Sequence, residues 1–155
     1  MGLLEEITQK TGVKFRAGAA SEIDRLRFLG VPEDALAFYR NSEPSKCAEI
    51  NRVRLWPISE VLAENTSYLP GCYLQPLAFI VFATTVFGDA FCFDTKAALA
   101  NVPAPVVLMA HDIDWGDLER DDIVKLARPV ATTLEEFFRK YTAGTLEITP
   151  LYPRA

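Results

Sequence analysis

The sequence has little of what metal or nucleophilic chemistry uses. His111 is the only histidine among 155 residues, and the three cysteines, Cys47, Cys72 and Cys92, are widely spaced with no CxxC pair. Zinc sites and disulfide frameworks need closely spaced or paired ligands, so neither is expected. We therefore predict three reduced, largely buried thiols and no resident metal or cofactor.

Glycine motifs and long apolar runs are also missing. The eight glycines are scattered singly, so the chain contains no GxGxxG, phosphate loop or GxSxG. Its longest apolar run, residues 77–87, is shorter than the roughly 20 residues of a membrane-spanning helix. The first ten residues, MGLLEEITQK, carry acids where a secretory signal carries basic residues, and Glu6 breaks the myristoylation pattern. We expect a cytoplasmic protein with no membrane partner.

Charge is distributed unevenly. Residues 55–95 contain no lysine or arginine, and residues 111–122, HDIDWGDLERDD, hold six acids and one arginine. The rest of the chain holds 15 basic and 15 acidic residues, so the net charge of −5 arises in that one stretch. Nucleic-acid binding favours a basic face, so we expect no nucleic-acid partner.

The acidic stretch has two interpretations. It can be a solvated loop that keeps the protein soluble. It can also be a surface that attracts a basic protein or a divalent cation. In the second case the predicted partner-binding residues are the six acids of the stretch: Asp112, Asp114, Asp117, Glu119, Asp121 and Asp122.

The N-terminal part predicts helices. Apolar residues recur at helical spacing in residues 2–10 and 21–30, and in the second segment Ser21 is the predicted N-cap and Gly30 the stop. Pro32 and the two acids after it predict a further helix over residues 31–42.

The middle of the chain switches to strand periodicity. Residues 49–56, EINRVRLW, alternate and predict one strand that carries Trp56 on its wetter side. A short helix is expected from Pro57, and residues 67–76 are predicted to be a loop because proline and glycine interrupt them. Residues 77–85 and 89–95 predict two antiparallel strands, with a further strand at 106–110.

The C-terminal part predicts helical structure again. A helical turn is expected within residues 117–127, and Thr133 with Glu136 forms a predicted capping box for a helix that Gly144 ends. Helices thus flank a run of strands. We predict an α+β fold over residues 1–155, a single domain whose central, mostly antiparallel sheet has helices packed against it.

Two carboxylates in the stretch VFGDAFCFDT, residues 86–95, raise the question of an active site. We favour a structural role. Gly88 and Asp89 would form the turn into the strand, with the aspartate bonding nearby backbone amides. Phe91 and Phe93 would enter the core on one side, and Asp94 would mark the exit of the strand.

His111 offers the alternative of a metal-dependent hydrolase. It stands beside Asp112 and Asp114 after an apolar strand, and Asp89 and Asp94 are expected on another strand nearby. Imidazole and carboxylates suit divalent metals. No HExxH, second histidine or regular ligand spacing supports the idea, so we predict that the protein is not an enzyme.

The order of five segments resembles the SUKH superfamily, also known by its SMI/KNR-type members. The segments are FLGVPEDALAFYRNS, RVRLWPISEV, GDAFCFDT, PAPVVLMAHD and TTLEEFFRKY. They match, in order, a proline-acid helix, a short strand and helix, a Gly-Asp strand with aromatics, a strand ending in His-acid, and a terminal helix. The resemblance spans about residues 21–142. Family members often have Asn-Gly after the second helix, where this chain has RNSEPS.

The resemblance implies a binding fold with no shared catalytic residue. Its structural motif would include Pro32, Trp56 and the Gly88–Asp94 strand. Many bacterial members are regarded as immunity proteins that neutralise a toxin, and fungal relatives as regulators. We therefore expect a non-catalytic immunity protein that neutralises a bacterial toxin, such as a basic nuclease-type toxin, by direct binding. The alternative from the same resemblance is an intracellular regulatory scaffold without a toxin partner.

Overall fold

The fold is built on a six-stranded sheet in which each strand pairs with the next one along the chain. The computed structural model describes residues 2–97 and 103–150. The sheet order is β3-β4-β5-β6-β7-β8, and every neighbouring pair is antiparallel. These strands are β3 (Ala48–Ile50), β4 (Val53–Leu55), β5 (Phe79–Thr85), β6 (Ala90–Asp94), β7 (Val106–Met109) and β8 (Arg128–Ala131). A separate two-stranded sheet joins β1 (Phe15–Arg16) to β2 (Glu43–Pro44).

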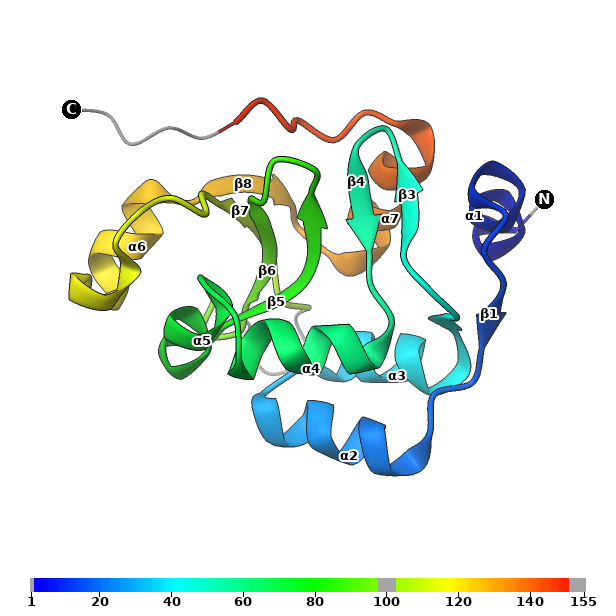
Figure 1. Cartoon of the computed structure of the whole chain (residues 1–155), viewed down its shortest axis with the longest axis horizontal. Coiled ribbons are helices and arrows are strands. Elements are labelled where there is room, and N and C mark those ends of the chain that lie inside the picture. Colours follow the sequence, from blue (N-terminus) through cyan, green and yellow to red (C-terminus); the bar gives the residue numbers. More distant parts are fainter. Residues whose placement is uncertain (1, 98–102, 151–155) are drawn as a thin grey trace.

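Helices cover both faces of the six-stranded sheet, one face thickly and the other thinly. The thick layer consists of α1 (Leu3–Thr11), α2 (Ala20–Leu29), α3 (Glu33–Asn41), α4 (Ile58–Thr66) and α7 (Leu134–Ala143), which share one apolar cluster. The thin layer consists of α5 (Gly71–Leu74), the 3-10 helix η2 (Trp115–Asp117) and α6 (Arg120–Leu126), which share a second. The predicted α+β fold with an antiparallel sheet flanked by helices is thus confirmed (Figure 1).

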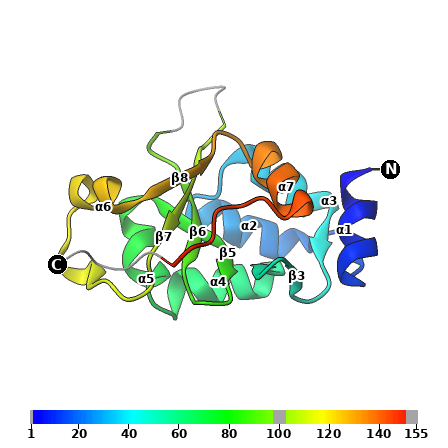
Figure 2. The same ribbon diagram turned by 90° about the horizontal axis from the view of Figure 1, so that it is seen from above.

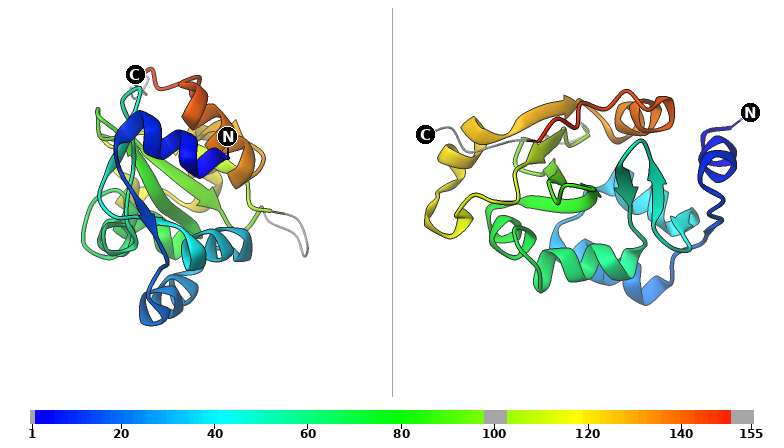
Figure 3. Two further views of the ribbon diagram at one scale, coloured as in Figure 1. Left: turned by 90° about the vertical axis from the view of Figure 1, so that its right-hand side faces the viewer. Right: turned by 45° about the horizontal axis from the view of Figure 1, so that its top comes forward.

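The two layers are displaced along the molecule. Helices α5 and α6 lie at one end and α1 at the opposite end (Figure 2 and the right panel of Figure 3). Strand β6 serves both layers because its side chains alternate. Phe91 and Phe93 enter the thick cluster, and Ala90 and Cys92 enter the thin one, as the sequence predicts. Burial raises the pKa of the Cys92 thiol.

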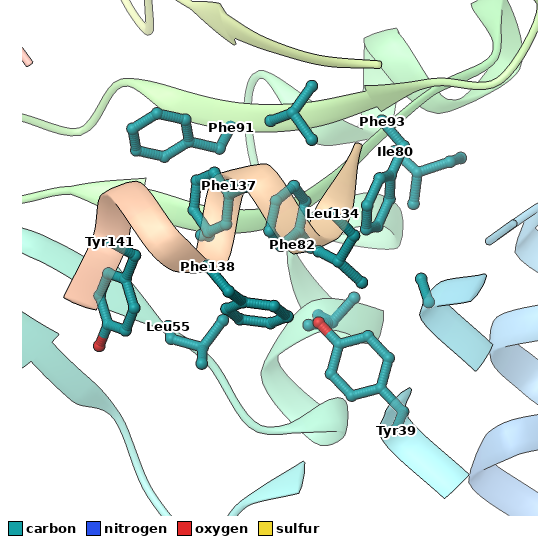
Figure 4. Close-up of a cluster of buried hydrophobic side chains, with 14 of the residues drawn as sticks. Tyr39, Leu55, Ile80, Phe82, Phe91, Phe93, Leu134, Phe137, Phe138 and Tyr141 are labelled. Atoms are coloured by element: carbon teal, nitrogen blue, oxygen red, sulfur yellow. The ribbon is translucent and has the colours of Figure 1, made fainter. Parts of the chain in front are cut away.

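Helix α7 anchors the thick layer with aromatic rings. Thr133 accepts a hydrogen bond from the Glu136 backbone N–H at 3.0 Å, and Gly144 ends the helix with a φ of 68°, as predicted. The reciprocal half of the predicted capping box is displaced, because the Glu136 carboxylate accepts from the Thr132 N–H at 3.2 Å. The fully buried Phe137 meets Phe82 edge-on with ring centroids 4.9 Å apart, and Phe91 at 5.2 Å (Figure 4). Such edge-to-face contacts add to simple area burial.

The predicted single strand over residues 49–56 is wrong, because the chain reverses in the middle of it. Asn51 and Arg52 both have positive φ, 46° and 68°, and connect β3 to β4 as a two-residue hairpin turn. The two residues of such a turn are usually Asn-Gly, because both need a positive φ. Here arginine replaces the glycine, so the sequence does not show the usual hairpin pattern. The tertiary structure supports the turn, since the Asn51 side chain donates to the Gly144 carbonyl at 2.8 Å.

Three further expectations need correction. Helix α2 begins at Ala20 without a side-chain cap, so Ser21 is not the N-cap. The predicted loop over residues 67–76 contains α5 and the start of a 3-10 helix, η1 (Gln75–Leu77), because its prolines stand at helix starts rather than inside helices. Strand β8 was not predicted; it contains Pro129, which an edge strand tolerates.

Two residues of the structural motif hold elements of the thick layer in place. Pro32 directly precedes α3 as its N-cap. Trp56 follows β4, and its indole Nε1 donates to the Thr84 Oγ1 on β5 at 2.8 Å. Both therefore have structural roles in the described part of the chain.

Candidate functional site

The acidic segment, defined as residues 111–122, lies on the outside of the thin layer. It runs from the end of β7 through η2 into the first turn of α6. All six predicted partner-binding acids are exposed: Asp112, Asp114, Asp117, Glu119, Asp121 and Asp122. The structure thus brings the six together on one continuous, solvent-facing segment.

Apolar side chains fix this segment to the sheet. Trp115, a residue of the segment, is buried against the sheet, and its indole Nε1 donates to the Ala110 carbonyl at 2.8 Å. Ile123 is buried on the inner side of α6. Glu119 and Asp122 form a reciprocal capping box at the start of α6, which holds their carboxylates in place. The backbone of the acidic segment is therefore anchored at Trp115 and at the start of α6, while the six acids stay exposed to solvent.

The only arginine of the acidic segment points inward. Arg120 pairs with Asp94 at the end of β6, donates to the Leu77 carbonyl at 2.8 Å, and lies over the Phe79 ring at 4.4 Å. Both charged side chains are largely buried, 17% and 11% exposed. Among residues 2–97 and 103–150, none of the six acids forms an ion pair. Their charge is left unneutralised at the surface.

Asp89 bonds a backbone amide, as predicted, and that amide belongs to His111 on the neighbouring strand end. The two residues meet because β6 and β7 are paired, Ala90 opposite Met109. The fully buried Asp89 Oδ1 accepts from the His111 backbone N–H at 3.1 Å and lies 2.8 Å from the imidazole Nδ1. Within the turn itself, the Thr85 Oγ1 accepts from the N–H groups of Phe87 and Asp89.

This Asp-His pair holds an imidazole that remains half-exposed to solvent. The side chain of His111 is 47% exposed. In the described part of the chain, no hydroxyl or thiol is hydrogen-bonded to His111. Nor do three or more His, Cys, Asp or Glu side chains in residues 2–97 and 103–150 gather closely enough to hold a metal ion. The three residues of the hydrolase hypothesis, His111, Asp112 and Asp114, therefore do not form a metal-binding group.

Replacing Gly88 with alanine is expected to destabilise the turn before β6 by about 1–2 kcal/mol. Gly88 has a φ of 95°, and a Cβ there would lie 3.3 Å from the His111 Cγ. Urea unfolding measures the loss. Gly116→Ala is the control, because a Cβ at Gly116 meets only ordinary contacts of 3.5 Å or more. Equal stability of both variants would contradict the proposed strain at Gly88.

Exposed apolar side chains lie next to the acidic segment, and the sequence did not reveal them. We call Tyr68, Leu69 and Tyr73 the tyrosine patch; they are 52%, 65% and 49% exposed. The patch belongs to α5 and the turn before it, and α5 packs on η2. The stretch SYLPGCYLQP was predicted to be a loop, and the position of its tyrosines beside the acids depends on the packing of α5 against η2.

Comparison of the chain with protein-family models gives no match, and comparison with curated proteins gives none either. Within the residues that the structure describes, no helix combines the length and apolar character required to cross a membrane.

Proposed function

We propose that this chain is a non-catalytic protein-binding domain, acting as an immunity protein that neutralises a bacterial toxin by direct binding. The observation that carries the proposal is the acidic segment, whose six exposed acids form no ion pair within residues 2–97 and 103–150, while its one arginine, Arg120, points inward. Complementary charge raises the association rate and specificity of protein complexes. The partner surface is therefore basic.

The resemblance to the SUKH superfamily supports the same proposal. Its motif residues have structural positions here: Pro32 precedes α3, and Phe91 and Phe93 fill the core. The motif residues thus support the resemblance, and we assign partner binding to the acidic segment. If the partner is a nuclease toxin, its phosphate-binding cleft is basic, and the six carboxylates would occupy it in place of a nucleic-acid backbone.

The test uses a toxin domain that the natural chain captures from its native host, together with a variant in which all six acids are replaced by their amides. Because steering depends on unneutralised charge, we expect the association rate constant to fall at least about tenfold at low salt. Surface plasmon resonance at two salt concentrations measures it. Protection of cells that express the toxin should be lost in parallel.

A matched control removes the same amount of charge elsewhere. Six acids of the first three helices serve, replaced in the same way: Glu5, Glu6, Glu22, Asp24, Glu33 and Asp34. This control should bind the toxin nearly as well as the natural chain. Equal weakening in both variants would assign the effect to net charge and overturn the acidic segment as the docking face.

A further inference from the structure

We propose that the tyrosine patch docks an arginine-bearing protein surface, with Tyr73 and Asp114 holding one guanidinium between an aromatic ring and a carboxylate. The inference rests on the proposed function and names the chemistry of the partner's contact residue. The proposed function requires only positive charge on the partner, and this inference requires arginine in particular.

The geometry at Gly116 brings the two side chains together. A Cβ added to Gly116 would lie 3.5 Å from the Asp114 Oδ1 and 3.5 Å from the Tyr73 Cε1. Since both atoms lie that close to one point, they are at most about 7 Å apart, which a planar guanidinium can bridge. Both side chains are exposed to solvent, so a partner can reach them.

The charges around the tyrosine patch favour a positively charged partner group. Residues 55–95, which include the whole patch, contain no lysine or arginine, and Asp114 has no ion-pair partner in the described residues. Helix α4, which packs against α5, adds Glu60 and Glu64 and no basic residue. An apolar surface that adjoins the unpaired carboxylate of Asp114 complements a cation that also has an apolar face.

The same chemistry is already present inside the thin layer. Arg120 lies over the Phe79 ring and pairs with Asp94, so one guanidinium is held by an aromatic face and a carboxylate together. Tyr73 and Asp114 repeat this combination at the surface without an arginine. Lysine suits such a site less well, because its ammonium is a strongly hydrated point charge that neither stacks flat nor forks.

The test compares two probes of equal charge, an arginine octapeptide and a lysine octapeptide, by isothermal titration at low salt. An exposed cation–π contact predicts that the arginine peptide binds the natural chain about two- to fivefold more tightly. Tyr73→Leu, which keeps apolar bulk against η2, should abolish this preference while leaving the affinity for the lysine peptide unchanged. Asp114→Asn should weaken both peptides and reduce the preference.

Phe28→Ala is the matched control. Phe28 is 93% exposed and lies one turn from Asp24, but that carboxylate is already bonded to Arg27 at 2.9 Å. Loss of the Phe28 ring should leave the preference for the arginine peptide intact. Circular dichroism and thermal unfolding verify that each variant is folded. If Tyr73→Leu does not fold, Asp114→Asn still tests the pair.

Each outcome has a distinct meaning. Equal binding of the two peptides, or a preference that survives Tyr73→Leu, overturns this inference and leaves the proposed function standing. Peptide binding that is unaffected by amidation of all six acids removes the acidic segment as a docking face and overturns both. A preference lost in Tyr73→Leu and kept in Phe28→Ala supports the inference.

Discussion

Replacing Phe137 with alanine is expected to lower the free energy of unfolding by about 3–5 kcal/mol, because it removes a fully buried ring and leaves a cavity. The ring lies at the centre of the aromatic cluster: its centroid is 4.9 Å from that of Phe82, 5.2 Å from Phe91 and 6.2 Å from Tyr141. One substitution therefore loosens the contact between α7 and two strands at once. Chemical denaturation followed by tryptophan fluorescence measures the change.

The control for this prediction is Phe28→Ala, which removes the same ring from an almost fully exposed position on α2. Substitutions at such surface sites usually change stability by less than about 0.5 kcal/mol. Similar losses in the two variants would show that the aromatic cluster does not hold the thick layer together.

Arg120→Ala is expected to lower the free energy of unfolding by about 3 kcal/mol, since it leaves Asp94 largely buried without its cation. Only 11% of the Asp94 side chain is exposed, and the variant also loses the hydrogen bond to the Leu77 carbonyl and the contact with Phe79. The effect should concentrate in α6 and the acidic segment. Hydrogen exchange resolved by peptide measures this local loosening.

A second variant separates the ion pair from packing. The double substitution Asp94→Leu with Arg120→Met replaces both charges by apolar groups of similar length, so it should recover much of the stability lost in Arg120→Ala. If the double variant were as unstable as Arg120→Ala, the uncompensated charge of Asp94 would not be the cause of the lost stability.

The two stability variants also serve the functional question. Phe137 belongs to the apolar cluster of the thick layer, whereas Arg120 belongs to the acidic segment and fixes it to the sheet. If docking depends on an ordered acidic segment, Arg120→Ala should weaken partner binding more than Phe137→Ala does, under conditions in which both variants are folded. This separates the ordering of the six acids from their charge.

Local patterns in the sequence predict several elements of the fold correctly. The breakers around two β-branched and aromatic runs indicate the β5–β6 hairpin, and Thr133 and Gly144 set the ends of α7. These succeed because turn and cap preferences act between residues close in the chain. The β3–β4 hairpin escapes prediction for the opposite reason, since its turn at Asn51 is supported by the distant Gly144.

The sequence alone determines that the negative charge of this protein is concentrated in residues 111–122, because charge is a property of composition. The tertiary structure decides what that charge can do. It pairs Arg120 with Asp94, 26 residues away in the sequence, and His111 with Asp89, 22 residues away. It also places Tyr73 beside Asp114. Contacts of this kind depend on strand register and on the packing of α5 and α6 against the sheet, which no short window of sequence encodes.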